Sequence, residues 1–144
     1  VLNAAGGELT SCCLAPVWTA AAPYYTLIVE QADAPDAAAM RRLATDLERV
    51  LRSLNIEYNG KRDSGRLGPL RVRTVEDGTW KRYDMATIAQ RRRGVEQYKH
   101  KFLMGDVAFE SRFPALAECE AEEPNAGRDA GVRRAGPPTG ARPC

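Results

Sequence analysis

The sequence predicts a single α+β domain: a small open mixed sheet of three to four strands, two helices packed on one face, and a disordered C-terminal tail. Three observations predict this class. Residues 24–30 are apolar on both faces of an extended chain, residues 40–54 carry an apolar stripe with helical spacing, and residues 79–94 show a second helical pattern. A chain of 144 residues, 44% of them hydrophobic and 28% charged, has room for one core.

Two strands are expected before the first helix. The stretch Leu9–Trp18 carries widely spaced apolar residues, and Pro16 places it at an edge of the sheet or at a strand end, because proline lacks the N–H that a ladder needs. Tyr24–Glu30 is rich in aromatic and β-branched residues, as expected of a strand buried in the middle of a sheet.

The first helix is expected to follow a turn at residues 31–35. Asp33 can cap it, and Pro35 suits its first turn, where the missing N–H is not needed. Burial of an apolar stripe on the sheet must stabilise this helix. The stripe has three- and four-residue spacing and comprises Met40, Leu43, Ala44, Leu47, Val50, Leu51 and Leu54.

A basic loop and a third strand come next. Asn59-Gly60 and Ser64-Gly65 bracket Lys61-Arg62-Asp63, and this abundance of turn formers predicts a loop. From Leu67 the pattern alternates, which predicts a strand with one face on the core and one largely in water. The core face carries Leu70, Val72 and Thr74.

The second helix is expected to begin at Thr79, a plausible N-cap, and to end at Gly94. The run Arg91-Arg92-Arg93 lies in its last turn, where cations suit the negative end of the helix dipole. The same run is alternatively part of a nucleic-acid-binding patch.

The ordered domain is expected to end near residue 113. Phe102–Met104 and Val107–Phe109 form a short last strand, broken at Gly105-Asp106. From Pro114 the composition shifts to Ala, Glu, Gly, Pro and Arg with hardly any large apolar residue. The predicted organisation is therefore a domain over residues 1–113 and a disordered tail over 114–144.

Charge is concentrated in the middle of the chain. The net charge is +2, but residues 60–112 carry 13 Lys or Arg against 7 Asp or Glu. A local field of this sign favours anionic partners such as phosphates, a nucleotide or nucleic acid, although a solvated basic face explains it equally well. A nucleic-acid-binding module would use Lys61, Arg62, Arg71, Arg73, Arg91 to Arg93 and Lys99. Interspersed acidic residues and few exposed aromatic positions make that partner the less favoured one. A protein-interaction domain is a third possibility.

The remaining composition excludes several classes of protein. No apolar run approaches the roughly 20 residues that cross a bilayer. The four cysteines and His100 lack the paired spacing of a zinc site or redox dithiol, so no metal is expected. Cys12 and Cys13 fit a strand and favour a cytosolic location. Because the chain begins at Val1, without methionine or a signal peptide, it is expected to be a fragment of something longer.

An ordered series of short motifs resembles a known family. The series consists of Tyr24–Glu30, Leu54-Asn55 followed by Tyr58, Lys61-Arg62, Leu67-Gly68-Pro69-Leu70-Arg71-Val72, Gly78-Thr79 and Gln97-Tyr98-Lys99. Its order and spacing closely resemble the C-terminal domain of the Gretchen Hagen family of auxin-responsive acyl-acid amido synthetases, including its bacterial members. The resemblance spans about Leu9 to Phe109.

The resemblance implies an enzyme that uses ATP to convert a carboxylic acid to an acyl-adenylate and then transfers the acyl group to an amine, typically an amino acid. A large N-terminal nucleotide-binding domain would hold ATP, magnesium and the acid, while the small C-terminal domain swings over the site as a lid. This chain resembles the lid alone. It is therefore not expected to be active by itself.

The resemblance also assigns roles to individual residues. Lys99 matches a lysine that approaches the adenylate, where a compact, mobile ammonium can neutralise charge developing on phosphate oxygens. Gln97 and Tyr98 would support the segment. Plant members usually continue with Pro-Arg, whereas this chain has His100-Lys101, so Lys101 is a candidate to replace the arginine. His100 is expected to be an ordinary surface residue, because the sequence names no carboxylate partner for it.

Overall fold

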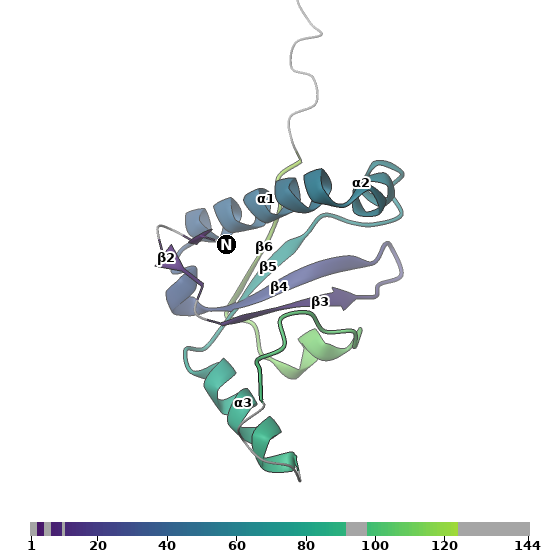
Figure 1. Cartoon of the computed structure of the whole chain (residues 1–144). Helices are drawn as coiled ribbons and strands as arrows, with labels where there is room; N and C mark the ends of the chain where they lie inside the picture. Colours follow the sequence, from purple (N-terminus) through teal and green to yellow (C-terminus); the bar gives the residue numbers. More distant parts are fainter. Residues whose placement is uncertain (1–2, 5–6, 10, 92–97, 124–144) are drawn as a thin grey trace, which may run out of the picture.

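A computed structural model describes residues 3–4, 7–9, 11–91 and 98–123. Its centre is a four-stranded sheet (Figure 1) in the order β3 (Cys12–Val17), β4 (Tyr24–Glu30), β5 (Arg71–Val75) and β6 (Ala117–Glu120). The pairing is antiparallel, then parallel, then antiparallel. The predicted α+β class with an open mixed sheet is therefore confirmed, and β4 has the predicted bounds. A separate antiparallel pair joins β1 (Asn3–Ala4) to β2 (Gly7–Glu8).

Helix α1 (Ala37–Leu54) covers one face of the sheet (Figure 1). Most of its predicted apolar stripe packs on alternate strand residues such as Leu14, Leu27 and Val72 in one core cluster. The stripe residues in or against this cluster are Met40, Leu43, Ala44, Leu47 and Leu51. Val50 and Leu54, which were also predicted to belong to the stripe, are exposed at the C-terminal end of the helix. The helix begins later than predicted, because residues 31–33 form a 3-10 turn, η1. Asp36, rather than Asp33, is the N-cap: its Oδ1 accepts a hydrogen bond of 2.7 Å from the backbone N–H of Ala39.

Helix α3 (Thr79–Gln90) lies on the opposite face of the sheet, which differs from the predicted arrangement with both helices on one face (Figure 1). The other set of alternate strand residues is also apolar and needs a cover. A second core cluster therefore forms from Cys13, Ala15, Ile28, Val75, Trp80, Met104 and Phe109. Gly78, with φ of 83°, occupies the N-cap position predicted for Thr79. Gly94, the predicted helix end, lies outside the described residues.

A short helix, α2 (Ile56–Asp63), occupies most of the predicted basic loop. Asn55 starts it, because its Oδ1 accepts a 3.0 Å hydrogen bond from the backbone N–H of Tyr58. Arg62 is buried, and its Nε donates to Oε1 of Glu48 on α1 at 2.6 Å. These two contacts favour a helix over the predicted loop.

The last predicted strand is replaced by other structure. Leu103 makes only an isolated parallel bridge to Leu14, and residues 109–112 form a 3-10 helix, η3 (Phe109–Arg112). The fourth strand is instead β6, within the stretch assigned to the tail. Its charged residues hold it in place: Glu118 accepts hydrogen bonds from Arg71 and Arg73 on β5. Residues 124–144 lie outside the described part of the chain.

No helix within the described ranges is long and apolar enough to cross a bilayer.

Candidate functional site

The segment 98–101 leads into the stretch that runs beside β3, and it carries Tyr98, Lys99 and Lys101, three of the residues singled out by the sequence. Lys99 and Lys101 are exposed, and Tyr98 is half-buried. Gln97 lies outside the described residues. After the segment, the backbone N–H of Leu14 donates to the carbonyl of Phe102 at 2.7 Å, which fixes the following chain to the edge of the sheet. The structure thus presents two cations to solvent from a segment joined to β3.

His100 is the anchor of this segment, contrary to the expectation of an ordinary surface residue. Its Nδ1 lies 2.8 Å and 3.0 Å from the two carboxylate oxygens of Asp84 on α3. Its Nε2 lies 3.1 Å from the backbone carbonyl oxygen of Cys12 on β3. The ring also meets the indole of Trp80 edge-on, with 5.5 Å between centroids. His100 therefore joins the segment to one helix and one strand.

Sequence reasoning missed Asp84, although one signal for it was available. Asp84 follows Trp80 by four residues, so a helix places it on the face that packs on the sheet. A half-buried carboxylate in that position needs a partner. The partner is 16 residues further along the chain, and the sequence does not reveal that distance in space.

Tyr98 binds the same carboxylate, because its hydroxyl donates to Oδ1 of Asp84. Burial, together with this hydrogen bond, raises the pKa of Tyr98 to about 12. The guanidinium of Arg91 lies over the ring of Tyr98, 5.2 Å from its centroid. Tyr98 therefore remains a neutral donor at physiological pH. Lys99 is held between two residues that share one carboxylate.

Cys13 completes an Asp–His–Cys arrangement that resembles a nucleophilic triad only in its residue types. Its Sγ lies 3.4 Å from Nε2 of His100, and its S–H donates to the carbonyl of Lys101 at 3.2 Å. The residue is 0% exposed, and burial raises the pKa of the thiol to about 12. A nucleophilic cysteine needs an accessible thiolate. Cys13 is not accessible, and its thiol keeps its proton at physiological pH, so its contacts are structural.

Three arginines of the nucleic-acid alternative are occupied by carboxylates. Arg62 is buried and pairs with Glu48 and Glu123, Arg71 pairs with Glu118 and Glu120, and Arg73 pairs with Glu110 and Glu118. Paired guanidinium groups release few counterions when they meet a phosphate, so they contribute little to nucleic-acid affinity. The geometry therefore does not favour a phosphate-binding face on this sheet.

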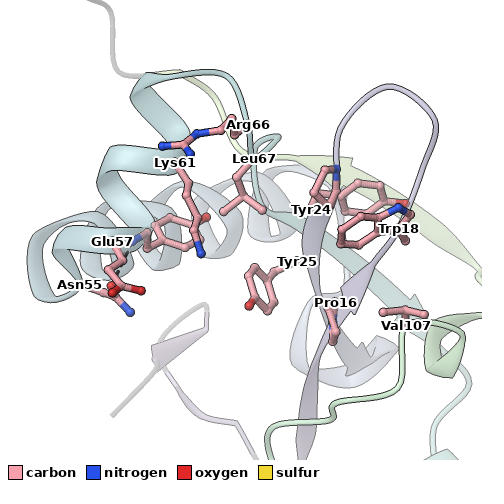
Figure 2. A pocket seen from close by; sticks show the side chains of 12 residues that line it. Pro16, Trp18, Tyr24, Tyr25, Asn55, Glu57, Lys61, Arg66, Leu67 and Val107 are labelled. Atoms are coloured by element: carbon pink, nitrogen blue, oxygen red, sulfur yellow. Dashed lines mark hydrogen bonds between the residues drawn. The ribbon is translucent and has the colours of Figure 1, made fainter.

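A concave surface of about 430 Å³ lies at the far end of β3 from His100. Figure 2 shows Glu57 and Lys61 on one side of this cavity and Trp18 and Val107 on the other, with Tyr25 between them. The 98–101 segment contributes no lining residue. Within the described part of the chain, no group of three or more His, Cys, Asp or Glu side chains is arranged to hold a metal ion. Lys99 therefore does not line this cavity.

Comparison with known proteins decides the family. The model of the GH3 family C-terminal domain matches residues 3–108 of this chain. The chain belongs to the GH3 family. This finding confirms the resemblance to the Gretchen Hagen family, and the match includes the whole 98–101 segment of this GH3 domain.

Solved structures agree with this assignment at the level of the fold. A structure titled "GH3.15 acyl acid amido synthetase" superposes with a TM-score of 0.64 at 18% identity, over 81% of this chain and 20% of that one. A second, titled "AtGH3.15 acyl acid amido synthetase in complex with 2,4-DB", gives a TM-score of 0.63 at 20% identity, over 81% of this chain and 21% of that one. The GH3 chain described here spans about a fifth of their length. Among curated proteins, none matches.

Proposed function

We propose that this chain is the lid domain of an ATP-dependent acyl-acid amido synthetase, which forms an acyl-adenylate and conjugates the acyl group to an amino acid or another amine. The observation that carries the proposal is the placement of Lys99 in a GH3 C-terminal domain. An exposed ammonium extends from a segment whose two neighbouring residues are fixed by Asp84. Such a cation can move onto an anion while its backbone keeps its place.

The chemistry expected of Lys99 is electrostatic. As an amine attacks an acyl-adenylate, negative charge develops on the departing phosphate oxygens, and a positioned ammonium stabilises that charge. Lys101 is a second cation two residues away, and we propose that it takes the place of the arginine of the plant members. Gln97 and Tyr98 would hold the backbone that precedes these cations.

ATP and magnesium would be bound by an N-terminal nucleotide-binding domain. The described residues of this chain offer no cluster of acidic ligands for magnesium, and the exposed cations suit contact with a nucleotide rather than its enclosure. The N-terminal domain is therefore the proposed partner, and the carboxylic acid and amine are the proposed substrates. We propose a cytosolic location, where ATP is available to the enzyme.

The test compares a two-domain enzyme carrying this chain with the same enzyme lacking residues 9–109. Carboxylic-acid-dependent exchange of pyrophosphate into ATP reports adenylate formation, and mass spectrometry reports the amide. We expect amide formation to require the domain. Equal amide turnover with and without residues 9–109 would refute a lid role.

A further inference from the structure

We propose that His100 is a positioning residue for Lys99: its protonated ring ties the 98–101 segment to α3 and β3, and loss of the proton loosens the segment. We call these contacts of His100 with α3 and β3 the clamp. The importance of Lys99 rests on the proposed function, but the clamp does not, because it can be measured on this chain without substrate.

The two ring nitrogens of His100 face acceptors on opposite sides. Nδ1 meets the Asp84 carboxylate, and Nε2 meets the carbonyl oxygen of Cys12, which can only accept a hydrogen bond. The nearby Sγ of Cys13 adds no donor to the ring, because its hydrogen is directed to the carbonyl of Lys101. A neutral imidazole has one N–H and can donate to only one of these two acceptors. An imidazolium has two N–H groups and can donate to both.

The other groups around the ring do not oppose a positive charge. From α3, Asp84 is an anion and Trp80 offers its indole; from β3, Cys13 is a neutral thiol. Tyr98 adds a neutral hydroxyl to the same carboxylate, and Arg91 faces the Tyr98 ring. The side chains of His100 and Asp84 are 21% and 23% exposed, so solvent screens this pair less than a surface pair.

Three contacts then fix the backbone on both sides of Lys99. The hydroxyl of Tyr98 holds the preceding residue to Asp84, the ring of His100 holds the following residue to Asp84 and β3, and the Cys13 thiol binds the carbonyl of Lys101. A catalytic cation misplaced by about 1 Å can lose a hundredfold in rate. His100 therefore controls where the base of the Lys99 side chain lies.

The first test is nitrogen-15 NMR of the ring of His100, which is the only histidine of the 144-residue chain. At acidic pH we expect both ring nitrogens to carry protons and the Nδ1 proton to exchange slowly with solvent, because it is hydrogen-bonded to Asp84. Asp84→Asn should make that proton exchange faster, whereas Asp106→Asn, which removes an exposed carboxylate paired with Arg112, serves as the control and should leave the exchange unchanged. Equal exchange of the Nδ1 proton in wild type and Asp84→Asn would overturn the clamp.

The second test measures the segment itself by hydrogen exchange of the backbone amides of residues 98–101. Protection in the wild type, corrected for intrinsic exchange, should fall as the imidazole loses its proton. In His100→Gln, where the amide can donate to the Cys12 carbonyl but carries no charge, protection should be lower and should not vary over that pH range. Equal protection in both proteins would overturn the proposal.

In the two-domain enzyme, we expect the wild-type kcat to fall as the pH rises and His100 loses its proton. His100→Gln should lower kcat at least tenfold with little change in the KM for ATP, and should remove this decline from the pH profile. A purely structural role would not change the shape of that profile. If the clamp is seen in the chain while Lys99→Ala leaves turnover unchanged, the clamp stands and the proposed function fails.

Discussion

The buried ion pair between Glu48 and Arg62 gives the sharpest test of how this fold is held together. Glu48 is 2% exposed and Arg62 is 8% exposed. The carboxylate also accepts hydrogen bonds from the Tyr58 hydroxyl at 2.6 Å and from the backbone N–H of Leu70 at 3.0 Å. One side chain of α1 thus joins α2 to the start of β5.

Arg62→Met keeps an unbranched apolar stem and removes the guanidinium with its charge. Glu48 then keeps two donors but loses its counterion, and the Leu67 carbonyl loses a 3.0 Å hydrogen bond. Breaking a buried pair in this way costs about 3–5 kcal/mol. A domain of this size has roughly 5–15 kcal/mol of stability, so a large part of it would be lost.

Urea unfolding followed by circular dichroism measures this loss. Arg49→Met is the matched control, because Arg49 lies on the same helix as Glu48 and pairs with Asp46 in solvent. An exposed pair contributes about 0–1 kcal/mol, so the control should change little. If both substitutions lower the free energy of unfolding by similar amounts, the buried pair does not have the role assigned here.

Two further predictions concern backbone and thiols. Gly78→Ala should destabilise the chain by about 1–2 kcal/mol, because Gly78 has a φ of 83°. Gly60→Ala should stabilise it by up to about 1 kcal/mol, because Gly60 lies inside α2 and a methyl group there meets open space. Melting temperatures of the two variants that shift in the same direction would contradict this. Burial raises the pKa of Cys12 to about 11 and of Cys13 to about 12, from 9.0. The folded chain keeps these protons where the unfolded chain releases them. The two thiols therefore leave stability unchanged well below pH 9 and lower it as the pH rises through 9, by about 3 kcal/mol at pH 10 for both together. Cys13→Ala should remove about half of that decrease, and an unchanged pH dependence in the variant would contradict the assignment.

Much of the fold follows from periodicity, and the failures have identifiable physical causes. The bounds of β4 and most of the apolar stripe of α1 were predicted because buried residues recur regularly over many positions, although Val50 and Leu54 at the end of the stripe are exposed. The turn formers of α2 concealed a helix that an Asn55 cap and the Glu48–Arg62 pair stabilise. In β6, charged residues that pair with β5 replace the apolar residues by which a strand is recognised.

The candidate site was likewise predictable only in part. The Gln97-Tyr98-Lys99 motif identified the segment, and the structure leaves the role of Lys99 a prediction. The position of Asp84 on the sheet-facing side of α3 could have been predicted, but its partner could not. Asp84, His100 and Cys12 meet only when α3 and the start of β3 are folded against each other, and local sequence carries no signal for that contact.

The central claim is that Lys99 stabilises charge during acyl transfer, and the turnover of Lys99→Ala in a two-domain enzyme tests it most directly. Loss of one preorganised charged donor should lower kcat by about a hundredfold. Lys81→Ala removes another exposed lysine, on α3, and should leave kcat unchanged. The free energy of unfolding of the chain should change by less than about 0.5 kcal/mol in both variants, because both side chains lie at the surface. A kcat for Lys99→Ala equal to that of Lys81→Ala would contradict the account.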